Sequence, residues 1–329
     1  MQALSQVPIR PRMNAYDQFQ PQKQSLAPLK EVKVRFPAEK PALKAVPLAP
    51  VHEKSTVVSS LNAAVPDVDL GDAGNPLAVP VYVKEIYAYL RQREKKPEYR
   101  VPSDFLDLQP EIDSEMRAVV VDWMSEVHTK FKLANESIFL AVNILDRFLT
   151  RKQVAKDRLQ LLGITSLLLA SKFEESYTPS VRSFGRVAKD FSSRQILAME
   201  RMLLQVTEFN LSDPTSLTFL RRFAKVAELT NRDKYLAFYL AELANANAKM
   251  VNFLPSEIAA GALFLTQKIV RAPEVWTGTI EAYSKYSAED LKDVTLFLKR
   301  CVYGAKQHQG IVGKYSVSRY YKVSTILNM

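Results

Sequence analysis

One nine-residue stretch, 116–124, constrains the fold of this chain more than any other. Its apolar residues recur with the spacing of one face of an α-helix, at Met116, Val119, Val120 and Trp123. Further apolar residues widen this arc, so we expect a central helix that is buried on more than one side. Two charged residues, Arg117 and Asp122, interrupt the run. A charge on a mostly buried helix needs a partner, because an unpaired charge is costly to remove from water.

Two more apolar helices with isolated charges follow. The first contains Asp146, and the second ends in the sequence Lys-Phe-Glu-Glu at residues 172–175. Arg117 and Asp146 lie on neighbouring predicted helices in apolar surroundings, and we predict an ion pair between them. Such a pair adds little net stability, but removing one partner strands a charge at a cost of roughly 3–5 kcal/mol.

The sequence predicts an all-α fold, because apolar residues follow helical spacing. No segment shows the alternation of apolar and polar residues, bounded by turn residues, that is typical of β-strands. A first set of five helices is predicted at residues 114–133, 135–150, 157–175, 180–189 and 192–204. The pattern then recurs at a constant offset of 96 residues, which places Trp123 on Phe219 and Asp146 on Glu242. We therefore predict two tandem five-helix domains, 78–212 and 213–329, and an extended surface tail over 311–329.

The N-terminal region has a different character. Residues 1–77 are rich in proline and poor in aromatic residues, and we predict a disordered regulatory tail. After Pro80, Tyr82, Ile86 and Tyr89 share a face of one amphipathic helix. This helix must dock on the core of the chain, and its aromatic edge is a candidate contact for a partner.

Composition excludes several classes of protein. No apolar stretch reaches the about 18 residues of a membrane span, and no secretory signal begins the sequence. The single Cys301 cannot form an internal disulfide and suits a reducing compartment, the nucleus and cytoplasm. The three histidines are scattered, and no phosphate loop or nucleophile elbow occurs. We therefore expect no catalytic residues, no metal and no cofactor.

The charged helices resemble the signature of a known family. Residues 116–124, Met-Arg-Ala-Val-Val-Val-Asp-Trp-Met, are similar to the cyclin-box sequence MRAILVDWL. Residues 145–149, 159–161 and 170–175 follow at the family's spacing, and 219–222 and 250–262 resemble mitotic B-type cyclins. The resemblance implies a cyclin fold. It also implies a non-catalytic subunit that activates a cyclin-dependent serine/threonine kinase at the G2/M transition and targets it to substrates.

The resemblance also assigns functions to individual residues. It implies that Lys172 and Glu200 grip the kinase's αC helix. Other residues expected to line the kinase contact are Phe173, Glu174, Glu175 and Phe209, with Tyr82, Ile86 and Tyr89 on the kinase's C-terminal lobe. A hydrophobic patch that docks Arg-x-Leu motifs of substrates is implied at Met116, Val119, Val120, Trp123 and Gln160. Part of this stripe must also face the core. We expect Val119 to be covered and the other four residues to remain partly exposed.

Two further features concern regulation. Basic residues at the start of the second domain, with Arg222 and Lys234 as the central pair, are a candidate anion pocket for phosphorylated partners. Mitotic cyclins carry a destruction box for the ubiquitin-ligase machinery, yet residues 1–75 contain no Arg-x-x-Leu or Lys-Glu-Asn. A match at residues 194–197 lies inside a predicted helix, where we expect it to be hidden.

Two alternatives remain. The chain could be an A-type or other cell-cycle cyclin with a different kinase partner. It could also be a nucleic-acid-binding transcription factor with a cyclin fold, which the formal net charge of +10 favours. Against binding to nucleic acid, acidic and basic residues are interspersed, and Lys172, Glu174 and Glu175 would have no role on DNA.

Overall fold

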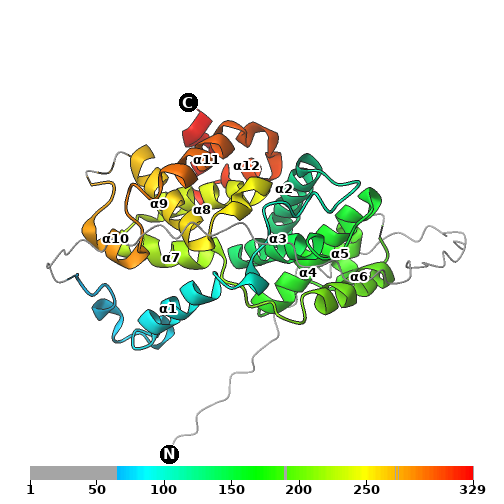
Figure 1. Cartoon of the computed structure of the whole chain (residues 1–329), viewed down its shortest axis with the longest axis horizontal. Coiled ribbons are helices and arrows are strands. Elements are labelled where there is room, and N and C mark those ends of the chain that lie inside the picture. The colour runs from blue at the N-terminus through cyan, green and yellow to red at the C-terminus, as the bar shows by residue number, and fades with distance from the viewer. Residues whose placement is uncertain (1–64, 189–190, 271, 273, 329) are drawn as a thin grey trace, which may run out of the picture. The chain divides into compact units, whose positions relative to one another are not determined.

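The structure is a computed structural model that describes residues 65–328 apart from 189, 190, 271 and 273 (Figure 1). Within these ranges the chain is helical and contains no strand, which confirms the all-α prediction. The helices are α1 (Val83–Arg93), α2 (Ser114–Phe131), α3 (Asn135–Leu149), α4 (Leu159–Glu174), α5 (Val181–Ala188), α6 (Ser193–Val206), α7 (Ser216–Val226), α8 (Asn231–Ala246), α9 (Pro255–Ile269), α10 (Gly278–Ser284), α11 (Lys292–Tyr303) and α12 (Gln309–Tyr315). The tail predicted over residues 1–64 lies outside the described residues.

The predicted internal repeat is present. Helices α3 and α8 begin 96 residues apart, and so do α4 and α9. Helices α2–α6 form a first set and α7–α11 a second set. Short 3-10 helices occupy the connections, at Leu70–Asp72, Pro76–Ala78, Pro97–Tyr99, Lys156–Arg158, Ala248–Asn252, Ala305–Gln307, Ser318–Tyr320 and Val323–Asn328. None of the helices in the described part of the chain is long and apolar enough to cross a membrane.

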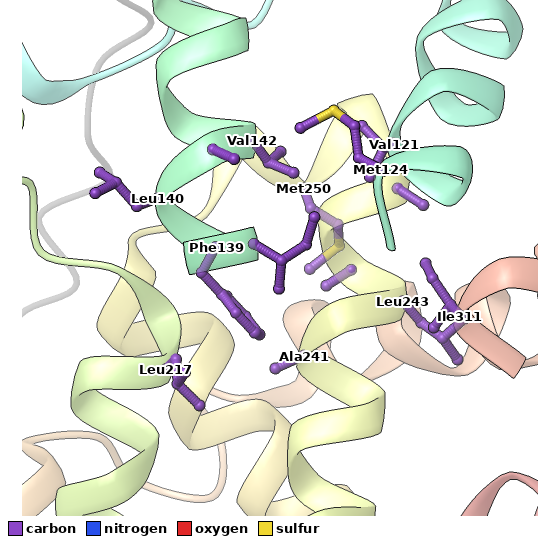
Figure 2. Packing of buried hydrophobic residues seen from close by; sticks show 14 of the residues in the cluster. Val121, Met124, Phe139, Leu140, Val142, Leu217, Ala241, Leu243, Met250 and Ile311 are labelled. Carbon is purple, nitrogen blue, oxygen red and sulfur yellow. The ribbon is translucent and has the colours of Figure 1, made fainter. Parts of the chain in front are cut away.

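Helix α2 packs against α3 and α4 of the first set and α8 of the second, but it is less buried than α3 and α4 and so is not the central helix that we expected. Asp113 begins it by accepting the backbone N–H groups of Glu115 and Met116, which have no partner inside the helix. Figure 2 shows side chains from α2, α3, α7, α8 and α12 in one cluster of buried hydrophobic residues. Helix α4 approaches α2 closely at Gly163, where an added Cβ would lie 2.7 Å from Val120 Cγ1. A side chain at this position would push the two helices apart.

The two charges that interrupt the apolar run of α2, Arg117 and Asp122, have buried partners. Arg117 donates two hydrogen bonds of 2.6 Å to the carboxylate of Asp146, as predicted. Its remaining nitrogen donates to the carbonyls of Asn245 and Ala246 at the end of α8, in the second set. Arg117 therefore joins the two sets of helices as well as pairing within the first.

Asp122 holds the C-terminal helix against α2. Its carboxylate accepts the backbone N–H groups of Gly310 and Ile311 in the first turn of α12, both at 2.9 Å. Only glycine fits at position 310, because an added Cβ would overlap the carbonyl oxygen of Asp122. The sequence indicated that Asp122 needs a partner but did not show which one.

The prediction of an extended surface tail over residues 311–329 is wrong. Glu242 of α8 is buried, and it accepts hydrogen bonds from Lys314 at 2.7 Å, Tyr315 at 2.8 Å and Ser125 at 2.5 Å. Burial alone would raise the pKa of Glu242, but the nearby charge of Lys314 lowers it below its usual value. The C-terminal segment is buried because it supplies the cation that this carboxylate requires.

Helix α1 packs on the second set, although it precedes the first set in the chain. The Tyr87 hydroxyl donates to the carbonyl of Thr218 at 3.1 Å, and the Tyr87 ring lies beside Phe219. Glu94, one residue beyond α1, is buried and accepts the N–H and the hydroxyl of Ser256 at the start of α9. Helix α1, which we predicted as part of residues 78–212, therefore also contacts the second set.

His128 on α2 generates a testable dependence of stability on pH. It is fully buried, and its Nε2 lies 2.8 Å from the carbonyl oxygen of Ala134. Burial, with a further effect of the Lys314 charge, lowers the pKa of His128 to about 3. Between about pH 6.5 and this value the unfolded chain binds a proton that the folded chain does not. The free energy of unfolding must therefore fall as the pH drops below about 6.5.

We predict that acidification from pH 7.5 to 5.5 costs the wild type about 1.4 kcal/mol more than it costs His128→Gln. The glutamine keeps a hydrogen-bond donor but cannot titrate. Urea unfolding of both proteins at the two pH values measures the difference. Equal losses in the two proteins would contradict a neutral, buried His128.

Candidate partner-binding site

The C-terminal end of α4 and the middle of α6 form a charged rim, which we define by Lys172, Glu174 and Glu200. Lys172 Nζ lies 2.6 Å from Glu200 Oε1. The lysine side chain is 41% exposed and the glutamate side chain only 11%. The structure therefore brings together the two residues that the sequence singled out. The ammonium group stays at the surface with donors left over, because one carboxylate oxygen uses only one of its three.

Aromatic side chains flank this rim. Phe173 is 50% exposed and Phe209 is 72% exposed. The backbones of Phe209 and Glu208 both have positive φ values, 57° and 54°. Residues other than glycine rarely adopt such values unless the surrounding structure holds them there. Arg147 holds this turn through a hydrogen bond to the carbonyl of Asn210. The strained turn places the Phe209 ring in solvent, where it is available to a partner.

The two glutamates after Phe173 have different environments. Glu175 accepts hydrogen bonds from the Ala134 N–H at 2.7 Å and the Ser137 hydroxyl at 2.6 Å. It therefore caps the start of α3, and its predicted contact with the kinase stays a prediction. Glu174 is exposed. Partial burial, followed by the charges of Glu136 and Glu175, raises the pKa of Glu174, so a cationic partner would stabilise its ionised form.

Sequence reasoning missed two exposed apolar residues near the rim. Tyr177 is 94% exposed and lies three residues beyond the end of α4. Leu197 of α6 is also exposed. Tyr177 lies outside any helical periodicity, so no pattern in the sequence pointed to it. Leu197 belongs to the match at 194–197, which is helical as predicted but has its Arg194 and Leu197 side chains exposed instead of hidden.

A second candidate surface lies on α1. The residues predicted to form its partner-facing edge are all exposed, at Tyr82, Ile86 and Tyr89. The opposite side of the helix carries Tyr87 and Leu90, which pack against the core. The helix that carries this edge packs on the second set, whereas the charged rim belongs to the first set.

A shallow groove lies where α2 and α4 meet. It is lined by Asp113, Glu115, Met116, Val119, Val120, Lys156, Leu159 and Gln160. Four of the five residues predicted for the docking patch are among them. Trp123 is not, since its half-buried side chain packs on the core. Val119, which we expected to be covered, is the most exposed apolar residue of α2 at 63%.

The structure contradicts the predicted anion pocket. Arg222 is buried, and both of its terminal nitrogens donate to the carboxylate of Asp69. The neighbouring basic residues are also paired, Arg221 with Glu136 and Lys225 with Asp69 and Asp72. Lys234 is thereby left without its predicted partner. Internal pairing also removes the basic surface of α7 that binding to nucleic acid would need.

Asp69 belongs to residues 65–77, which we predicted to be part of the disordered tail. They are described, they contain two short 3-10 helices, and Asp69 is buried. The predicted boundary at residue 77 is therefore too late. In the described parts of the chain no group of three His, Cys, Asp or Glu side chains could hold a metal ion.

Comparison with known proteins places these features in a family context. Residues 85–212 match the family model "Cyclin, N-terminal domain", and residues 214–329 match "Cyclin, C-terminal domain". The chain is 41% identical to the G2/mitotic-specific cyclin-B1 of Oryzias latipes over 81% of this chain and 66% of that protein. It is 36% identical to the G2/mitotic-specific cyclin-B1 of Xenopus laevis over 97% of this chain and 82% of that protein.

A solved structure shares the fold. A viral cyclin from herpesvirus saimiri superposes with a TM-score of 0.58 at 21% identity, over 65% of this chain and 96% of that chain. The chain spans 66% of the length of the Oryzias latipes relative.

Proposed function

Since the chain belongs to the cyclin family, with B-type mitotic cyclins among its relatives, we propose that it is the non-catalytic regulatory subunit of a cyclin-dependent kinase of the mitotic type. The observation that supports this proposal most is the charged rim of Lys172, Glu174 and Glu200, flanked by exposed aromatic rings. A rim that carries both signs of charge beside apolar anchors suits a helix of a partner protein.

The rim complements the two ends of a helix. The Lys172 ammonium suits the partial negative charge at a helix C-terminus or a carbonyl that lacks a partner there. The carboxylates of Glu174 and Glu200 suit N–H groups or cationic side chains. Glu200 is mostly buried and bonded to Lys172, so the pair is held in place before the partner arrives. We propose that this rim clasps the αC helix of the kinase.

Activation then follows as a shift between two states of the kinase. In an active protein kinase a glutamate on αC pairs with a lysine of the ATP site, which requires αC to lie inward. A subunit that binds the inward state more tightly favours that state without taking part in the chemistry. A shift from about 1:99 to 99:1 requires a preference of about 5.5 kcal/mol. Contacts at the rim and along the edge of α1 would supply it together.

The groove on α2 suits a short substrate motif with a basic and an apolar residue. The side chains of Met116, Val119 and Val120 give it an apolar floor, and its charged lining residues are Asp113, Glu115 and Lys156. The apolar floor would accept a leucine, and the two carboxylates would attract an arginine. We propose that Arg-x-Leu motifs of substrates dock here, at a distance from the kinase contact.

The rim predicts which substitutions abolish activation. Lys172→Ala and Glu200→Ala should each lower activation of a purified mitotic kinase more than tenfold at subsaturating concentrations, because each removes half of the pair. Lys292→Ala is a matched control. Lys292 is the first residue of α11, outside the rim, and the substitution breaks only its surface ion pair with Glu289. The rate at which the kinase phosphorylates a peptide substrate in the presence of each variant measures the activation. If both rim variants activated the kinase as well as the control does, the proposal would fail.

The groove predicts an effect on only one class of substrate. Val119→Asp should raise the KM for a substrate with an Arg-x-Leu motif by about tenfold, because it puts a charge on the apolar floor. A substrate with the same phosphorylation site and no motif should be unaffected. Steady-state kinetics with the two substrates measures this difference. An equal change for both substrates would place the effect on the kinase and not on docking.

A further inference from the structure

The segment before α1 is bound to the second set of helices as a ligand would be. We name residues 66–72 the N-terminal clasp. Asp69, at its centre, is 5% exposed. Its two carboxylate oxygens accept hydrogen bonds from the two terminal nitrogens of Arg222, and Lys225 adds a third at 2.8 Å. A bidentate pair of this kind fixes direction as well as distance.

Aromatic side chains complete the binding site of the clasp. The Arg222 guanidinium lies 5.5 Å from the ring centre of Tyr87 and 5.1 Å from that of Tyr283. The Tyr283 hydroxyl donates to the carbonyl of Pro66 at 3.1 Å and accepts the Val68 N–H at 3.3 Å. The clasp is therefore held by its backbone as well as by its carboxylate.

Helix α1 depends on contacts at its two ends. It has 11 residues, and none of them is fully buried. An isolated helix of this length is marginal in water, so tertiary contacts must hold it. At its C-terminal end Glu94 binds Ser256. Near its N-terminal end Lys84 donates to Asp67 of the clasp at 2.7 Å, and one turn further on the Tyr87 ring touches Arg222, which binds Asp69. Residues 73–82 connect the clasp to the helix.

We propose that Asp69 is a positioning residue, and that the N-terminal clasp holds the Tyr82, Ile86 and Tyr89 edge of α1 in the place where the kinase contacts it. The proposal rests on the proposed function. Holding the edge before binding lowers the cost of ordering it in the complex. If the binding-competent position were only partly populated, the apparent affinity would fall by that fraction.

The charge of Asp69 makes this arrangement independent of pH in the physiological range. The hydrogen bonds from Arg222, opposed by burial and aided by Lys225, lower the pKa of Asp69 to about 2. The carboxylate therefore stays ionised, and the clasp stays closed, until the pH approaches that value. From the sequence we predicted that residues 1–77 are a disordered tail. Only the structure therefore suggests that Asp69 positions α1.

The test uses the full chain and the variant Asp69→Asn, which keeps the size of the side chain and removes its charge. We expect amide hydrogen exchange over residues 83–87 to become at least about tenfold faster, with exchange in α2 and α4 unchanged. We expect the Kd for the mitotic kinase to rise by about tenfold, with activity at saturating concentrations unchanged. This split separates positioning of α1 from loss of the rim.

Three companion proteins complete the test. Lys292→Ala breaks only a surface ion pair with Glu289, outside both the clasp and α1, and should behave as the wild type. Tyr283→Phe keeps the ring beside Arg222 and loses the two hydroxyl contacts, so it should weaken binding in the same direction and by less. Tyr283→Phe also replaces Asp69→Asn if the latter does not fold. Lys172→Ala should lose activation with normal exchange in α1.

The outcomes are distinguishable. Unchanged α1 exchange and unchanged kinase affinity in both clasp variants would overturn the proposal. Faster exchange without a change in affinity would overturn it too, because the clasp would then be structural only. If the wild type fails to activate the kinase, the proposed function fails, whereas the exchange data alone would still show whether the clasp holds α1.

Discussion

The buried guanidinium of Arg117 binds to both sets of helices. It bonds to Asp146 in the first set and to two carbonyls at the end of α8 in the second. A buried ion pair contributes little net stability compared with apolar packing, but it tolerates only one geometry. The fixed arrangement matters because the charged rim lies on the first set and the α1 edge lies on the second. A partner that contacts both surfaces needs them at a constant distance.

The two sets of helices share their backbone arrangement but differ in the partners of their buried charges. Glu242 occupies the position of Asp146 in the second set, and both carboxylates are buried. Asp146 receives its cation from the first helix of its own set, whereas Glu242 receives Lys314 from α12. The residue 96 positions after Arg117 is Asp213, which pairs with Arg147 instead. The drift in charge therefore explains why a C-terminal helix is needed beside the second set.

Much of this arrangement was predictable from the sequence. Periodicity gave α1 and the helices of the first set, a constant offset gave the repeat, and the isolated charges gave the Arg117–Asp146 pair. Partners far apart in the sequence were not predictable, because periodicity gives the face of a helix and not what covers it. The burial of Lys314 and the pairing of Asp69 with Arg222 are examples. Proline content also misled the prediction for residues 65–77, since the buried carboxylate of Asp69 and two backbone hydrogen bonds to Tyr283 hold a segment that has little apolar surface.

The candidate site was also predictable only in part, because the sequence does not show which segments lie beside each side chain. A resemblance in motifs singled out Lys172 and Glu200, and helical spacing singled out the edge of α1. The structure pairs Lys172 with the mostly buried Glu200 and exposes the α1 edge. The inward-facing Glu175 looked like its neighbour Glu174 in sequence. Only the position of the α3 N-terminus, which Glu175 caps, distinguishes the two.

Native-state hydrogen exchange in Arg117→Met tests the central claim, that α2 makes the two sets one unit, most directly. The substitution preserves apolar packing and leaves Asp146 and the α8 carbonyls without their donor, at a cost of roughly 3–5 kcal/mol. The account predicts that amides of α3 and α8 lose protection together and by the same free energy. Loss of protection in α3 with α8 unchanged would contradict it.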